Sequence, residues 1–111
     1  MENKELLKQA LEFGRKLRNT LKEKETISLY LNIKDFSKTE DVHHFVLYIG
    51  EMAYDYNFEL PDVVVNILTY DKVLQSDIMY CIMLGLKSEA VVDKEIESSK
   101  NNKNRKNAYT C

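Results

Sequence analysis

The sequence predicts an all-α fold, a compact bundle of four or five helices with a disordered C-terminal tail. Three observations predict it. Three long segments repeat apolar residues at three- and four-residue steps, which is the spacing of one helix face. The chain has 111 residues, of which 44% are hydrophobic, enough for one core. Its last residues are almost entirely polar. We therefore predict one helical domain over 1–97 and a flexible basic tail over 98–111.

The first predicted helix covers residues 2–24, with Asn3 as the N-cap and Glu5 in the first turn. Its apolar side chains fall on one side of the helix axis. They are Leu6, Leu7, Ala10, Phe13, Gly14, Leu17 and Leu21. A second sector carries cations. They are Lys4, Lys8, Arg15, Arg18 and Lys22.

Residues 27–33 leave two interpretations open. Apolar and polar residues alternate there, as in a strand. The only partner with a strand-like composition is 63–70, yet Leu60-Pro61-Asp62 before it resembles a helix start. We favour a helix over 61–71, which makes 27–33 a short helix or an extended connector. The alternative is an α+β fold with 27–33 and 63–70 as a two-stranded element.

Residues 39–56 form another predicted helix, capped by Ser37 or Thr39 and ended by Asn57. Its apolar positions repeat at helical spacing. They are Val42, Phe45, Ile49, Met52, Ala53 and Tyr56.

The last predicted helix covers residues 76–97, with Ser76-Asp77 at its start. Its first half, 78–86, is apolar nearly all round, which is typical of a helix at the centre of a bundle or in an interface. The sequence therefore leaves open whether two copies of the chain form a homodimer through this segment. The three glycines, Gly14, Gly50 and Gly85, all lie inside helical patterns and predict close helix packing.

Sequence features favour a cytoplasmic protein without membrane contact. The chain shows no apolar run of signal-peptide length near its start, and its longest apolar stretch is too short to cross a bilayer. Cys81 lies among apolar residues and is predicted to be a buried thiol, whereas Cys111 is the last residue. A disulfide between them is not expected.

Nothing in the sequence assembles an enzyme, a metal site or a cofactor site. His43 and His44 are adjacent and point about 100° apart on a helix, so they do not share a metal easily. No serine sits in a nucleophile elbow, and no glycine-rich phosphate loop is present. We predict that the protein is not an enzyme and takes no cofactor.

Charge is unevenly distributed behind a net charge of −2. Residues 1–24 hold seven basic and four acidic groups, residues 25–79 hold three and ten, and residues 100–111 hold four basic groups and none acidic. Such asymmetry is compatible with an interaction through charged surfaces, and also with a basic helix that simply packs beside the acidic middle of the chain.

Two functions follow from these patterns. The first is a small non-catalytic protein-binding module, such as an inhibitor, an immunity protein or an accessory protein. The abundance of Lys, Asn, Ile and Tyr is compatible with a bacterial or phage source, including a mobile element. Its partner would be another protein, met either by the basic sector of the first helix or by acidic and tyrosine side chains of the helix 39–56. These residues are Glu51, Asp55, Tyr48 and Tyr54.

The alternative is a nucleic-acid-associated helical subunit that contacts phosphates through the first helix and the basic tail. The helix residues would be Lys8, Arg15, Arg18 and Lys22. Against it, the isoelectric point is about 5.7, and no helix-turn-helix or zinc-finger spacing is present.

Overall fold

The computed structural model describes residues 3–87, and all the regular secondary structure in this part of the chain is helical. Its elements are α1 (Asn3–Thr20), α2 (Glu23–Lys38), α3 (Val42–Tyr56), the short α4 (Asp62–Val65), the 3-10 helix η1 (Ile67–Thr69) and α5 (Lys72–Leu86). The prediction of an all-α bundle is confirmed, and the α+β alternative is wrong. The predicted domain end at residue 97 and the tail over 98–111 lie outside the described residues.

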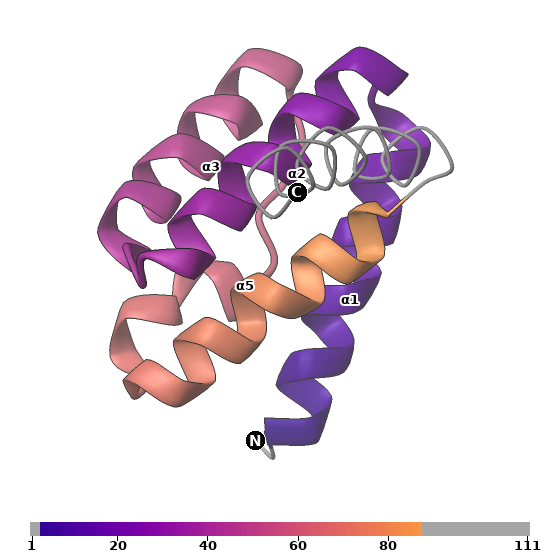
Figure 1. Ribbon diagram of the computed structural model, residues 1–111. Coiled ribbons are helices and arrows are strands. Elements are labelled where there is room, and N and C mark those ends of the chain that lie inside the picture. Colours follow the sequence, from indigo (N-terminus) through magenta and orange to yellow (C-terminus); the bar gives the residue numbers. More distant parts are fainter. Residues whose placement is uncertain (1–2, 88–111) are drawn as a thin grey trace, which may run out of the picture.

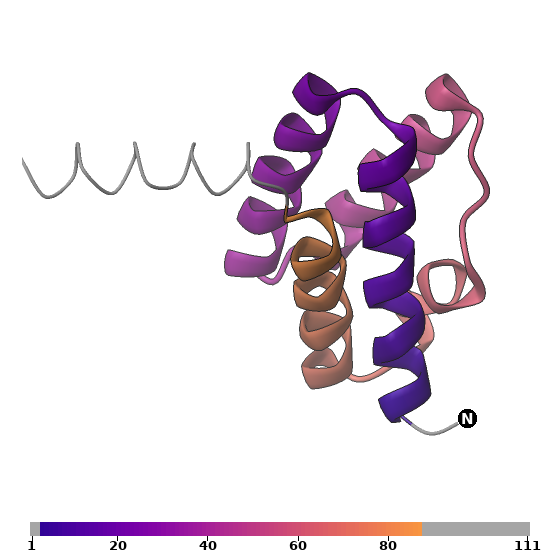
Figure 2. The same cartoon turned by 90° about the vertical axis from the view of Figure 1, so that its right-hand side faces the viewer.

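The helices pack around α5. In two views at right angles α5 lies against α1 (Figures 1 and 2), and it also contacts α2, which in turn contacts α3. The core is made of fully buried side chains from every helix. They include Leu17, Leu29, Phe45, Ile49, Val63, Ile78 and Ile82. The nearly all-apolar start of the predicted last helix therefore lies at the centre of the bundle, although Tyr80 remains exposed, as does Val73 earlier in α5.

Two glycines set the distance between α1 and α5. A Cβ atom on Gly14 would lie 2.9 Å from the Cα of Gly85 and would collide with the carbonyl oxygen of Ile82. The two backbones are thus in direct contact, as predicted for these two glycines. Gly50 differs, because a Cβ atom placed on it would meet nothing within 4 Å. The prediction of close packing inside the fold is wrong for Gly50.

The first predicted helix is shorter than expected. It ends at Thr20, whose hydroxyl donates to the carbonyl of Lys16 (2.7 Å), and the chain then turns into α2. Lys22 is the extended residue before α2, and Glu23 and Glu25 occupy the first turn of that helix, where acidic groups are favourable. The expected row of cations from Lys8 to Lys22 on one helix is therefore interrupted.

Residues 27–33 lie within α2, so the strand-like alternation is incidental. The buried residues of this helix are Thr26, Leu29, Tyr30 and Ile33, which follow helical spacing, whereas Leu31 is exposed.

Two other helices begin at aspartates that the sequence analysis did not select. Asp41 caps α3 by accepting from the backbone N–H of His44, and Asp71 caps α5 by accepting from that of Leu74 (2.9 Å). The expected caps at Ser37 or Thr39 and at Ser76-Asp77 are wrong, because Ser37 belongs to α2, Thr39 ends that helix, and Ser76 and Asp77 lie inside α5. The predicted stop at Asn57 is confirmed by its left-handed backbone (φ 55°).

The expected continuous helix over 61–71 is divided into α4 and η1. Asn66 separates them, and its carbonyl accepts from the Thr69 hydroxyl at 2.6 Å. The division still buries Val63, Val64 and Ile67, so the apolar residues reach the core through two short turns. α5 ends at Leu86, and residues 88–97 of the predicted last helix lie outside the described part.

Candidate protein interface on helix α3

The outer side of α3 exposes large apolar groups. The side chain of Tyr54 is 89% exposed and that of Leu47 is 64% exposed. The two residues are seven positions apart, which places them along one line of the helix, two turns apart. The opposite side of α3 buries Val42, Phe45 and Ile49 in the core. The tyrosine and leucine are therefore not needed to fill the protein's own interior.

A shallow groove of about 440 Å³ lies on this outer side. Residues of α3 alone line it: Val46, Leu47, Gly50, Glu51, Tyr54 and Asp55. We call these six residues the outer α3 face. Among them is Gly50, which has no side chain, and a Cβ atom placed on it would meet nothing within 4 Å. Val46 and Tyr54 stand one helical turn on either side of that glycine.

The charges of the outer α3 face have one sign. Glu51 and Asp55 are exposed and one turn apart, so they form a short acidic edge beside the line from Leu47 to Tyr54. Helix α3 contains no Lys or Arg. The face thus combines exposed apolar groups, an open glycine and two carboxylates.

Three of the four residues predicted for protein binding meet on this face: Glu51, Tyr54 and Asp55. The fourth, Tyr48, is half-buried and packs against α2, with its ring centroid 5.6 Å from that of Phe36. Its hydroxyl accepts a hydrogen bond from Asn32 (3.0 Å). Tyr48 therefore joins α2 to α3, which is a structural role visible in the fold.

Leu47 was missed by the sequence analysis. The signal was available, because Leu47 does not share the side of the helix that carries Phe45 and Ile49. A large apolar residue on the polar side of an amphipathic helix is a sign of a contact surface.

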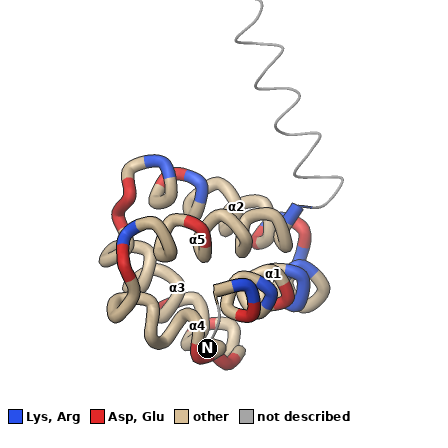
Figure 3. Tube along the Cα trace, turned by 90° about the horizontal axis from the view of Figure 1, so that it is seen from below, with Lys and Arg blue, Asp and Glu red and all other residues tan. Residues whose placement is uncertain are grey.

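The cations predicted for nucleic-acid binding are divided between different surroundings. Lys8 and Arg15 are exposed on α1, which carries both basic and acidic residues (Figure 3). Arg18 is half-buried, and its Nη1 donates to the carbonyl oxygen of Lys87 at the C-terminal end of α5 (2.8 Å). A cation is favourable at a helix C-terminus, so Arg18 has a structural partner within the fold.

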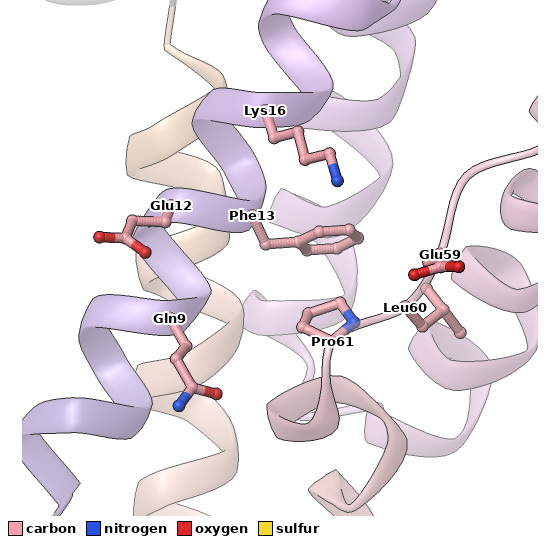
Figure 4. A pocket seen from close by; sticks show the side chains of 7 residues that line it. All are labelled: Gln9, Glu12, Phe13, Lys16, Glu59, Leu60 and Pro61. Carbon is pink, nitrogen blue, oxygen red and sulfur yellow. The ribbon is translucent and has the colours of Figure 1, made fainter.

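Another groove, of about 360 Å³, lies between α1 and the segment before α4. Figure 4 shows the ring of Phe13 close to Pro61, with Lys16 and Glu59 around them and Glu12 pointing away. Phe13 is itself 5% exposed and packs against Phe58, with ring centroids 6.0 Å apart. The groove therefore mainly reflects how the 57–61 connection packs on α1.

Side chains that could bind a metal ion or act as a nucleophile are dispersed over the described part of the chain. Among residues 3–87, no three His, Cys, Asp or Glu side chains are placed to hold a metal ion. Cys81 is half-buried rather than buried, and desolvation together with the nearby Asp77 raises the pKa of its thiol. A raised pKa leaves little reactive thiolate at neutral pH. Among the described residues, no helix is both long enough and apolar enough to span a membrane.

The cap of α3 has a pH dependence that can be measured. The Asp41 carboxylate accepts from the backbone N–H of His44 (3.2 Å) and lies 2.6 Å from its Nδ1 atom. The backbone hydrogen bond, with the imidazole beside it, lowers the pKa of Asp41 from 3.8. A lowered pKa in the folded state stabilises the protein above the unfolded pKa, and this contribution is lost as the pH falls through the folded value.

We therefore expect the free energy of unfolding to fall more steeply below about pH 4 in the wild type than in Asp41→Asn. Asparagine caps a helix nearly as well but does not titrate. Urea unfolding between about pH 6 and pH 2.5 measures both proteins. Parallel curves for the two proteins would show that the carboxylate of Asp41 does not contribute in this way.

Fold and surface together define a small helical domain in which α3 turns an apolar, acidic face outward. Comparisons with models of protein families, with curated proteins and with solved structures each found no match to this chain.

Proposed function

We propose that this protein is a non-catalytic protein-binding module that docks another protein on its outer α3 face. The observation that carries the proposal is the exposed pair Leu47 and Tyr54, which lies opposite the buried side of the same helix. Tyrosine is enriched among the residues that dominate interface energies, because it offers a large contact area and a hydrogen bond at low entropic cost.

The size and surface of the chain support a role in which it covers or bridges its partner. Inhibitors, immunity proteins and accessory proteins act in this way, without chemistry of their own. The carboxylates of Glu51 and Asp55, beside Leu47 and Tyr54, support specific and fast association with a basic partner, because charge complementarity acts more on the association rate than on affinity.

A photo-crosslinking amino acid at position 47 tests the proposal in the native cell. The matched control carries the same group at Val73, which is 73% exposed on α5. We expect a discrete protein adduct from position 47 and none from position 73. Absence of an adduct at position 47, or equal adducts at both positions, contradicts the proposal. An adduct whose mass decreases on nuclease treatment contains nucleic acid and favours the nucleic-acid alternative.

Tyr54→Ala is expected to weaken binding of the crosslinked partner at least about 30-fold, the loss of about 2 kcal/mol that marks a dominant interface residue. Tyr80→Ala is the control, since Tyr80 is also exposed but lies on α5. Titration calorimetry with the purified partner gives both dissociation constants. Equal affinities for the two variants would remove Tyr54 from the interface.

A further inference from the structure

Gly14 and Gly85 show what a glycine inside a helix does in this protein. Where α1 and α5 cross, each glycine lets the other backbone approach so closely that a single Cβ would collide. Glycine in a helix interior costs about 1 kcal/mol relative to alanine. In the α1–α5 crossing, close packing explains that cost.

Gly50 carries the same cost without a partner in the described part of the chain. The space above its Cβ position is open, and Gly50 is among the residues that line the groove. Apolar side chains stand around this opening, with Leu47 and Tyr54 the most exposed. This is the geometry that a second helix needs to cross at short distance, as α5 does on α1.

The charges beside the opening restrict the chemistry of what can cross there. Glu51 and Asp55 are exposed along one edge, and α3 supplies no Lys or Arg to offset them. A helix lying along the outer α3 face brings its own flank next to both carboxylates. Lys or Arg on that flank is favourable, whereas Asp or Glu is repelled.

We propose that the occupant of the outer α3 face is a helix of the partner protein that carries Gly, Ala or Ser over Gly50 and Lys or Arg opposite Glu51 and Asp55. This inference rests on the proposed function, whose docking surface it specifies. The small residue allows the close crossing, Leu47 and Tyr54 provide the apolar contact, and the cations fix the register.

A second copy of this chain is a poorer occupant. Two α3 helices that cross at Gly50 about a two-fold axis bring Glu51 of each copy close to the other, because both residues adjoin the crossing point. Like charges at such a position are destabilising. The groove therefore favours a different, basic helix.

The test uses the full-length protein and a displayed library of single helices with one randomised face. Selection on the wild type is compared with selection on Gly50→Leu, and the double variant Glu51→Lys/Asp55→Lys is the second comparison. A selected helix is assigned to the outer α3 face if the substitution Leu47→Arg abolishes its binding. Circular dichroism and thermal unfolding confirm that each variant is folded, which the open space around Gly50 leads us to expect.

We expect wild-type binders on this face to be enriched in Gly, Ala or Ser at one position and in Lys or Arg one turn away. Their affinity should fall at least about tenfold on Gly50→Leu, and their association rate on the charge-reversed double variant should fall about tenfold at low salt.

Binders on this face with large residues over Gly50, or with acidic flanks, overturn the helix inference. The crosslink at position 47 is a separate measurement, so the proposed function can stand while this inference fails. No binder on this face also overturns the inference. Sedimentation of the wild type as a dimer that Gly50→Leu dissociates assigns the face to a second copy instead.

Discussion

Gly14→Ala is expected to lower the free energy of unfolding by about 3 kcal/mol, the upper end of the usual cost of overpacking a core. The added methyl group would meet the carbonyl oxygen of Ile82 and the Cα of Gly85. Both are backbone atoms, so relief requires α1 and α5 to move apart rather than one side chain to turn. Gly85→Ala has the same expectation, because its Cβ would lie 2.7 Å from the backbone nitrogen of Arg15.

Gly50→Ala is the matched control and is expected to have the opposite sign. Alanine at this open helical position should add about 0.5–1 kcal/mol, because it restricts the unfolded chain and favours the helix. Urea unfolding of the three variants gives the comparison. For a domain of this size, a loss of 3 kcal/mol lowers Tm by roughly 12 °C or more. Equal effects at positions 14 and 50 would contradict the glycine crossing.

The fold class could be predicted from the sequence because helical periodicity survives in any local window. The ends of the helices could not, since several residues compete for each cap. Ser76 has the right side chain for an N-cap, yet Asp71 takes that role because Leu74 is buried in the core, and α5 must begin early enough to place it there. Only the packed structure decides between such candidates.

Residues 27–33 show a related limit. Over seven residues, alternation and helical spacing select overlapping sets of apolar residues. Extending the window to Thr26 and to Phe36, which packs on the core, favours the helix. Burial of the polar residue Thr26 leaves no unsatisfied donor, because its hydroxyl donates to the carbonyl of Lys22 (3.1 Å).

The candidate interface was partly predictable for a geometric reason. Glu51 and Asp55 are one turn apart, so any correct helix assignment places them together on the side away from Phe45. Tyr48 could not be separated from Tyr54 in this way, since its partners Asn32 and Phe36 come from another helix. The contact of Arg18 with Lys87 joins residues 69 positions apart and is likewise invisible to a local pattern.

Phe45→Ala is expected to cost about 3–5 kcal/mol of stability, the largest effect among substitutions in α3. Its ring is 0% exposed and lies on the side of the helix that faces the core. Removing the ring loses its burial and leaves a cavity that the neighbouring helices fill only in part. Phe45→Leu keeps most of the volume, so it should cost about 1 kcal/mol and remain folded.

Tyr54→Ala is the counterpart on the other side of α3, and its stability should change by no more than about 0.5 kcal/mol, because its side chain is 89% exposed. Urea unfolding of the three variants separates the two sides of one helix. Phe45→Leu and Phe45→Ala should lose stability in proportion to the volume removed, while Tyr54→Ala keeps it and loses partner binding. A large loss of stability in Tyr54→Ala would mean that the tyrosine stabilises the fold. That result would contradict the proposal that Tyr54 is exposed on the outer α3 face in order to bind a partner.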